Sequence, residues 1–289
     1  MSVAKNSVTK IINTNIDWRL LSMCGEMITA RLTDSLGIGI ETLIRPRWSY
    51  DPNGAEGIAP IPNALRLRTF GKVLSLGTKI TEEFQLRLVS TRDNFQQIVR
   101  SHLVLNCILT TNNVNSEVIA TAEFWLALTR PFAAPSERKI LKIPAALGFL
   151  IEQHEQTTDL CNLGEDFFSC SKTVSEEIIS DTKEIAYHMD RSDSNRHVNM
   201  NVYIDQILDV FAYKFYQCQQ DPARLRFKEI IVRYRKPFLP GDLARLCFEI
   251  KQNGTSFEGA AKLYHPVNKK KINKVFSIAL KTTASIAPD

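Results

Sequence analysis

Alternating apolar and polar residues predict long β-strands in two separate stretches of the chain. The expected strands of the first stretch are rich in β-branched and aromatic residues and are separated by turn-forming residues: 80–89, 98–109 and 118–129. The expected strands of the second stretch have the same character: 244–251, 258–264 and 272–283. Each stretch is therefore expected to fold into an antiparallel sheet.

A helix is predicted before the strands of each stretch. Over 198–217, apolar residues form one stripe at helical spacing: Ile204, Ile207, Leu208, Phe211 and Phe215. A weaker stripe, interrupted by Gly25, predicts a helix within 17–36. A strand over 172–187 is expected to precede the second helix, so each half reads as strand, helix and then several antiparallel strands.

A short repeat links the two halves. Phe70-x-Lys72 followed by Gly77 recurs as Tyr234-x-Lys236 followed by Gly241, with identical spacing. Together with the matching order of elements, this repeat predicts a duplicated domain. We expect one half over 1–135, a linker over 136–169 with a short helix at 145–153, and the other half over 170–289. The predicted class is α+β, in which a sheet covers an apolar helix.

Composition narrows the class of protein. A chain of 289 residues with 44% hydrophobic and 23% charged residues is long enough for two small folded domains. No apolar stretch approaches the roughly 20 residues that cross a bilayer, and the first residues lack the apolar run of a secretory signal. The six cysteines show neither a CxxC pair nor metal-ligand spacing. Reduced thiols, a cytoplasmic location and no metal site are expected.

The net charge of +5 suits an acidic partner. The basic residues do not form a convincing cluster, and Lys269 to Lys271 follow a predicted hairpin turn, where a solvated charged turn is the simplest interpretation. Neither a nucleic acid nor a membrane is expected as a partner.

Polar residues of the types that take part in catalysis gather just before the second predicted helix. They follow a regular spacing: Asp193, Asn195, His197 and Asn199, with Tyr203 one turn further on. A single Asp or Asn at this place is usually a helix cap, and one residue of 192–195 is expected to cap this helix. The whole set in register before an apolar helix indicates an active site instead.

This pattern resembles the C-terminal half of the acyl-carrier-protein thioesterases and, more broadly, the Asp-x-x-x-His-Val-Asn loop of hot-dog thioesterases. The resemblance implies a double hot-dog fold, with two antiparallel sheets that each wrap a long central helix. It implies that Asp193 is the nucleophile or the base that activates water. His197 would orient substrate or move a proton, and Asn195 would bond the carbonyl or position water. Asn199 and Tyr203 would support these residues from behind and contribute to substrate binding.

A helix N-terminus suits thioester chemistry. Negative charge develops on the carbonyl oxygen during attack, and unpaired backbone N–H groups with the positive end of the helix dipole stabilise it. No cofactor is expected, because the substrate itself carries phosphopantetheine or coenzyme A. The apolar face of the helix would line an acyl tunnel.

The chain departs from the thioesterase pattern in the strand after the helix. The family reads Tyr-Arg-x-Glu-Cys there, whereas this chain has Pro237 and Phe238 at the Glu and Cys positions. Neither residue performs acid–base chemistry. Arg233 and Arg235 alternate with apolar residues and are candidates to hold the phosphate of a phosphopantetheine arm; a solvated strand face is the simpler interpretation. His102 and His188 are expected to lie in strands and to be structural.

Three functions stay open from the sequence. The first is hydrolysis of an acyl thioester on acyl carrier protein or coenzyme A. The second is acyl transfer, decarboxylation or dehydration in polyketide or fatty-acid biosynthesis, which the missing Glu favours. For this function Ser22-Met23-Cys24-Gly25-Glu26 resembles the Met-Cys-Gly start of double hot-dog proteins from polyketide clusters. The third is an acyl-binding module without catalysis. Two fused hot-dog halves would allow a monomer, and a homodimer is the alternative.

Overall fold

The computed structural model describes most of the chain: residues 7–22, 25–46, 57–112, 116–131, 133–140, 142–150, 152–154, 159–170, 178–192, 197–217, 221–268, 271–272 and 275–287. Asp193 and Asn195 lie outside these ranges, as does Cys24. The described chain divides into two compact units. Unit 1 consists of Met1–Met27, Arg31–Arg66 and Phe70–Asn162, and unit 2 consists of Ile28–Ala30, Leu67–Thr69 and Leu163–Asp289. The predicted boundaries at 135 and 170 stay predictions.

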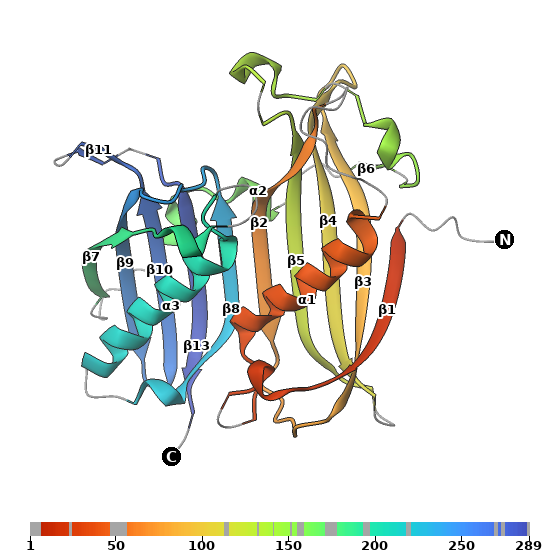
Figure 1. Ribbon diagram of the computed structural model, residues 1–289. Helices are drawn as coiled ribbons and strands as arrows, with labels where there is room; N and C mark the ends of the chain where they lie inside the picture. Colours follow the sequence, from red (N-terminus) through yellow and green to blue (C-terminus); the bar gives the residue numbers. More distant parts are fainter. Residues whose placement is uncertain are drawn as a thin grey trace. The chain divides into compact units, whose positions relative to one another are not determined.

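Unit 1 contains a sheet with the order β1-β3-β4-β5-β2. Its strands have these bounds: β1 Val8–Asn15, β2 Ala59–Thr69, β3 Lys79–Arg92, β4 Ile98–Thr111 and β5 Val118–Thr129. Helix α1, Leu32–Gly39, continues as a π-turn at Ile40–Ile44 and packs against β4 and β5 (Figure 1). The three strands expected from alternation are confirmed, since every second residue in them is buried.

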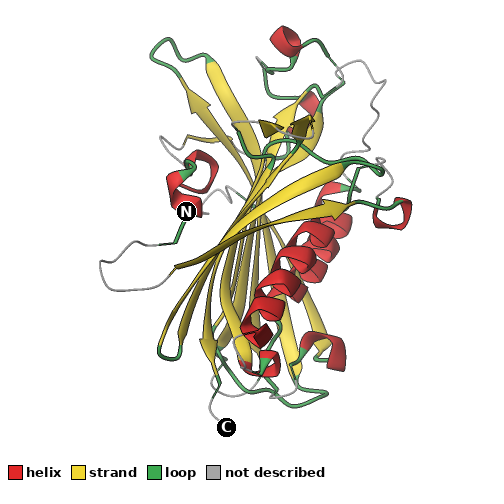
Figure 2. Cartoon of the chain, turned by 90° about the vertical axis from the view of Figure 1, so that its left-hand side faces the viewer, coloured by secondary structure: helices red, strands yellow, loops and turns green. Residues whose placement is uncertain are grey.

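Unit 2 contains a sheet with the order β7-β9-β10-β13-β8. Its main elements have these bounds: β7 Ile178–Ala186, α3 Met200–Gln217, β8 Leu225–Tyr234, β9 Leu243–Asn253, β10 Ser256–Tyr264 and β13 Ile278–Ile286. A small hairpin, β11 Pro266–Asn268 and β12 Lys271–Ile272, follows β10. Figure 2 shows α3 lying along the strands. The predicted helix is confirmed, and its apolar stripe is the buried side of α3.

The strand order is the same in both units. In each, the strand before the helix forms one edge of the order, the strand after the helix forms the other, and three later strands fill the middle in the order of the chain: β3, β4 and β5 in unit 1, and β9, β10 and β13 in unit 2. The turn that carries the repeat is also the same. The N–H of Gly77 donates to the carbonyl of Ile16 at 2.9 Å, and the N–H of Gly241 donates to the carbonyl of Tyr187 at 2.8 Å. The internal repeat in the sequence therefore corresponds to a repeated arrangement of elements.

Helix and sheet come very close in both units at a glycine. The glycine belongs to the helix in unit 1 and to the sheet in unit 2. In unit 1, a Cβ at Gly39 of α1 would lie 2.8 Å from Cδ1 of Phe84 in β3. In unit 2, a Cβ at Gly259 of β10 would lie 2.8 Å from Cε2 of Phe211 in α3. Each aromatic ring fills the space that the missing side chain leaves, so these contacts set the distance between helix and sheet.

Three predicted elements were wrong in place or type. The helix expected within 17–36 begins only at Leu32, because Asp17 caps a 3-10 turn at Trp18–Leu20 and Gly25 adopts a φ of 74° that interrupts a helix. The linker helix expected at 145–153 is a 3-10 turn at Ala145–Leu147 followed by β6, Glu152–His154, which pairs in parallel with β3.

The strand expected at 272–283 is also different. Strand β12 ends at Ile272, and β13 begins at Ile278 and continues to Ile286. His188 does not lie in a strand as expected, because it precedes a 3-10 turn at Met189–Arg191 after β7 has ended. His102 does lie in β4, where it is buried and packs edge-on against Trp125. Two further short helices, α2 Asp159–Asn162 and a 3-10 turn at Asp166–Phe168, precede β7.

Candidate functional site at the start of α3

The first turn of α3 is capped by Asn199. Its side-chain oxygen Oδ1 accepts a hydrogen bond from the N–H of Asn201 at 2.9 Å, which satisfies one of the unpaired donors of the helix start. The cap expected within 192–195 is therefore supplied by a later residue. Ser192, at the beginning of that stretch, instead donates its hydroxyl to the carbonyl of Met189 at 2.7 Å.

Backbone contacts join the two ends of the segment that carries the motif. Ser192 and Val198 form an antiparallel bridge, and the N–H of Asn199 donates to the carbonyl of Arg191 at 2.8 Å. Of the five residues between Ser192 and Val198, residues 193–196, which include Asp193 and Asn195, lie outside the described ranges. His197 is half-buried and stands directly before the bridge. The backbone thus holds a short closed loop at the N-terminus of an apolar helix.

Phe238 joins this loop to the sheet. Its carbonyl accepts the N–H of Val198 at 2.9 Å, and its own N–H donates to the hydroxyl of Tyr203 at 3.0 Å. The Phe238 ring packs against the rings of Tyr187 and Tyr203, with centroid distances of 5.2 and 6.0 Å. The side chain that the sequence marked as a departure from the thioesterase pattern is fully buried and serves as a structural anchor for the helix start.

His265 belongs to the same cluster and was not singled out from the sequence. Its ring stacks on Phe238 at 4.0 Å, its Nε2 lies 3.2 Å from the carbonyl of Pro237, and its Nδ1 lies 3.8 Å from Oδ2 of Asp242. Burial and the nearby Lys236 lower its pKa below the usual value of a histidine. His265 precedes Pro266 in the sequence and therefore read as part of a turn; only the folded chain brings it to Phe238.

The two arginines proposed to bind phosphate have different surroundings. Arg233 lies in β8 and is only 8% exposed. Arg235 lies just beyond the end of β8, is exposed, and places its guanidinium 4.0 Å from the ring centroid of Phe276. Arg235 therefore lies outside the strand on which the sequence analysis expected it, and it makes a cation–π contact with Phe276.

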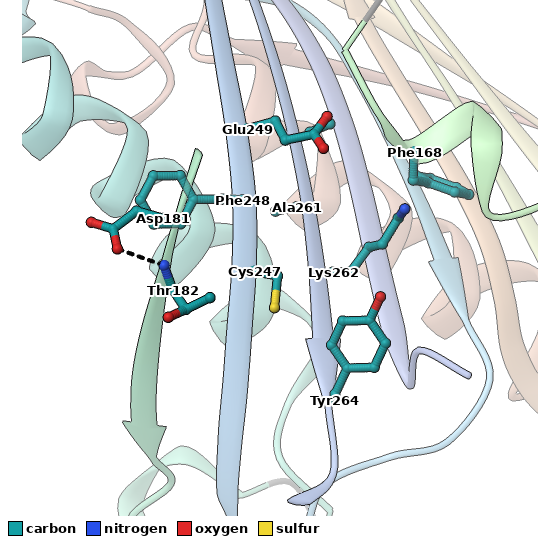
Figure 3. Close-up of a pocket in the computed structure, with 10 residues that line it drawn as sticks. Phe168, Asp181, Thr182, Cys247, Phe248, Glu249, Ala261, Lys262 and Tyr264 are labelled. Atoms are coloured by element: carbon teal, nitrogen blue, oxygen red, sulfur yellow. Dashed lines mark hydrogen bonds between the residues drawn. The ribbon is translucent and has the colours of Figure 1, made fainter. Parts of the chain in front are cut away.

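A cavity of about 400 Å³ lies elsewhere in unit 2 (Figure 3). Its polar lining includes Cys247, Glu249, Lys262 and Tyr264. Cys247 and Glu249 flank Phe248, which packs on Phe211 of α3, so alternation puts them on the sheet face opposite α3. The cavity is therefore separated from the helix start by the sheet.

The cavity offers no activated nucleophile. Burial raises the pKa of the Cys247 thiol, and burial together with Glu165 and the neighbouring groups raises the pKa of Tyr264 to about 12. Both groups therefore keep their protons at neutral pH, when a nucleophile would need to lose one. This chemistry makes the start of α3 the better candidate site.

Within the described ranges, no three His, Cys, Asp or Glu side chains gather in a way that holds a metal ion. No described helix combines the length and apolar character needed to span a bilayer.

Unit 1 contains a counterpart of the motif loop. Leu21 and Met27 form an antiparallel bridge that corresponds to the one between Ser192 and Val198, with the same number of residues enclosed. Counting from this bridge, Ser22 occupies the place of Asp193 and Glu26 the place of His197. The Oγ of Ser22 accepts the N–H of Glu26 at 3.2 Å, so this loop is closed by its own side chain.

The comparisons with known proteins find similar solved structures but no similar sequence. No family model matches the chain, and no curated protein matches it. A candidate oleoyl thioesterase from Lactobacillus plantarum is similar over 99% of both chains, with a TM-score of 0.65 and 10% identity. The 12:0-ACP thioesterase from Umbellularia californica covers 96% of this chain and 94% of its own, with a TM-score of 0.61 and 8% identity.

An acyl-ACP thioesterase from Bacteroides thetaiotaomicron is similar over 96% of this chain and 98% of its own, with a TM-score of 0.54 and 14% identity. At such identities the likeness concerns the fold. The resemblance seen in the motif thus extends to the architecture of nearly the whole chain, and the protein has the hot-dog fold of these thioesterases.

Proposed function

We propose that this protein hydrolyses an acyl thioester carried by acyl carrier protein or coenzyme A. The observation that carries the proposal is the closed loop at the start of α3, where His197 precedes a capped, apolar helix. The hot-dog fold shared with thioesterases supports it. The identical strand orders of the two units also support a double hot-dog layout.

In the proposed mechanism, the substrate carbonyl lies at the N-terminal end of α3. Asp193 activates water or attacks directly, Asn195 bonds the carbonyl or positions the water, and His197 orients the substrate or moves a proton. The helix dipole stabilises the charge that develops on the carbonyl oxygen. Arg235, which is exposed, is the better candidate to hold a phosphate of the carrier arm; Arg233 is the weaker one, because it is buried and alternation points it to the sheet face away from α3.

Acyl transfer, decarboxylation or dehydration is the second candidate. One observation favours it: Pro237 and Phe238 stand where the family has Glu and Cys, and Phe238 is buried with both backbone groups bonded. Without that Glu, acid–base chemistry at this site falls to other groups, such as those of the motif loop and His265 beside Phe238. Substrates of this class would also be thioesters, so the two candidates differ in the product.

The deciding experiment measures thiol release from a panel of acyl thioesters, with mass spectrometry of the products. The variants are Asp193→Ala and its matched control Ser22→Ala, which changes the corresponding position of unit 1. We expect Asp193→Ala to lower kcat/KM by about 10²- to 10⁴-fold, the usual contribution of a general acid or base. Ser22→Ala is expected to change it less than about 2-fold, because its hydroxyl serves only the local loop.

Free acid that disappears in Asp193→Ala supports hydrolysis at this site. A transferred, shortened or dehydrated acyl product would replace the proposal with the second candidate. Binding without turnover would leave an acyl-binding module, and equal losses in both variants would contradict the assignment of the motif loop.

A further inference from the structure

Three tyrosines of unit 2 surround the start of α3: Tyr187, Tyr203 and Tyr234. The rings of Tyr187 and Tyr203 meet edge to face at 5.6 Å. Tyr203 uses its hydroxyl to accept the N–H of Phe238. Burial, and after it Tyr203, raises the pKa of both Tyr187 and Tyr234.

The register of the sheet puts Tyr234 on the face that α3 covers. Gly259 faces Phe211 of α3, and cross-strand partners point to the same face of a sheet. Gly259 pairs with Thr282, which pairs with Ile230, and Tyr234 lies four residues further along the same strand. Tyr234 therefore points toward the helix layer, at the end of β8 that leads to Phe238.

The hydroxyls of Tyr187 and Tyr234 are both buried and have no hydrogen-bond partner among the described residues. The two side chains are 1% and 6% exposed. Native proteins pair nearly all such groups, because a buried hydroxyl without a partner destabilises the fold. One of them contacts Tyr203 of α3 and the other lies on the sheet face that α3 covers, and together they point to a place that is completed by a ligand with a hydrogen-bond acceptor.

The corresponding places of unit 1 carry no hydroxyl. Ile16 makes the same pair of backbone hydrogen bonds as Tyr187, to Thr78 and from Gly77 instead of Asp242 and Gly241. The sequence repeat aligns Phe70 with Tyr234, and counting from the loop bridge aligns Leu32 with Tyr203. The shared backbone therefore folds without any of the three hydroxyls, which appear only in the unit that carries the motif loop.

We propose that the hydroxyls of Tyr187 and Tyr234 are catalytic hydrogen-bond donors for the carbonyl oxygen of the bound thioester, an inference that rests on the proposed function. Each phenol has one proton to donate, and a carbonyl oxygen has two lone pairs to accept them. In a site closed to water, such donors stabilise an oxyanion far more than they do in water.

The phenols keep their protons throughout the reaction. When water adds to the carbonyl carbon, the π electron pair moves to the oxygen, which the two O–H groups hold by hydrogen bonds. Asp193 accepts the proton that water loses. The electron pair then returns, the C–S bond breaks, and the departing thiolate receives that proton. Because burial raises the pKa of both phenols, they remain neutral donors at physiological pH.

The test compares four phenylalanine variants that each remove one oxygen atom. Tyr187→Phe and Tyr234→Phe remove the unpaired hydroxyls. Tyr203→Phe removes a paired one, and Tyr264→Phe removes one from the cavity on the opposite face. We expect about a 10²-fold loss of kcat for each of the first two, the size found for one oxyanion donor. We expect Tyr264→Phe to be unchanged.

The midpoint of thermal unfolding distinguishes a catalytic role from a structural one, because loss of a structural hydroxyl would lower it. Tyr187→Phe and Tyr234→Phe are expected to keep or raise the midpoint, because each removes an unpaired buried group, whereas Tyr203→Phe is expected to lower it. Reduced turnover with an unchanged or higher midpoint supports the proposal. A lower midpoint with unchanged turnover in Tyr187→Phe and Tyr234→Phe would overturn it and indicate a bond to resident water.

Binding of two unreactive probes separates this inference from the proposed hydrolysis. The probes are an S-(2-oxoalkyl) and an S-alkyl thioether of matched chain length, each on coenzyme A and on pantetheine-loaded carrier protein. We expect the native chain to prefer the oxoalkyl probe and the two variants to lose that preference. A native preference that depends on the tyrosines supports carbonyl binding even without turnover. Asp193-dependent hydrolysis with a preference that the variants retain would overturn this inference alone.

Discussion

The two units build the same backbone around the start of their helices and fill it with different side chains. Both have a 3-10 turn, an antiparallel bridge that closes a loop, and a glycine turn bonded to the strand before the loop. Unit 1 places Ile16, Leu32 and Phe70 where unit 2 places tyrosines. Since unit 1 forms this backbone with apolar residues, the fold does not require the hydroxyls, and their presence in unit 2 points to chemistry.

The glycine contacts give the largest expected change in stability. We expect Gly39→Ala and Gly259→Ala each to lower the free energy of unfolding by about 1–3 kcal/mol, because the new methyl group meets an aromatic ring at 2.8 Å. Urea denaturation measures the change. The neighbours of the new methyl group differ between the units. Phe84→Leu is expected to rescue Gly39→Ala in part, because Cδ2 of Leu105 remains at 2.9 Å, and not to rescue Gly259→Ala; Phe211→Leu is expected to rescue only Gly259→Ala. Rescue of Gly39→Ala by Phe211→Leu, or of Gly259→Ala by Phe84→Leu, would contradict the assignment of these contacts.

A buried acid distinguishes the sheet of unit 1. Glu82, five residues after Gly77, is 4% exposed, and its Oε2 has no hydrogen-bond partner among the described residues; Leu246 stands five residues after Gly241 in unit 2. Burial raises the pKa of Glu82, against a hydrogen bond from Ser35 that lowers it. The folded chain therefore binds this proton more tightly than the unfolded chain, and the free energy of unfolding decreases as pH rises above the ordinary pKa of a glutamic acid.

Replacing the acid with its counterpart tests this difference. We expect Glu82→Leu to raise the free energy of unfolding at pH 8 by about 1–3 kcal/mol, the cost of an unsatisfied buried group, and the gain to shrink toward acidic pH. Urea denaturation at a series of pH values provides the measurement, with Glu82→Gln as the control for shape. A variant that is less stable than the native chain at pH 8 would contradict the prediction.

The helix caps give the smallest expected effect. The side chain of Asn199 caps α3, whereas Arg31 before α1 makes no capping hydrogen bond with its side chain. We therefore expect Asn199→Ala to lower the free energy of unfolding by about 1 kcal/mol and Arg31→Ala to change it by less than about 0.5 kcal/mol. Equal losses, measured by urea denaturation, would show that the two helix starts are stabilised in the same way.

The strands and α3 were predictable because alternation and helical spacing persist over many residues. The position of α1 was not, since its apolar residues serve a bridge and a turn before the helix begins at Leu32. Strand β6 is three residues long and is defined only by its pairing with β3. Segments this short carry no periodicity of their own.

The candidate site was predictable only where its residues follow one another in the chain. His197 and Asn199 stand in a readable motif, and Asn199 caps the helix as its residue type allows. Tyr187, Tyr234 and His265 come from three other segments, and the missing partners of the two phenols depend on everything packed around them. Such a property has no signature in a single sequence.

The placement of the two close-contact glycines makes the two helices poor substitutes for each other. The recess lies in the helix of unit 1 and in the sheet of unit 2. A chimera that carried α3 over the sheet of unit 1 would bring Phe211 against Leu105, which the strand register places where unit 2 has Gly259, while α1 over the sheet of unit 2 would leave a gap. Each helix therefore fits the sheet of its own unit and not that of the other, and the two units cannot exchange helices without new substitutions at these contacts.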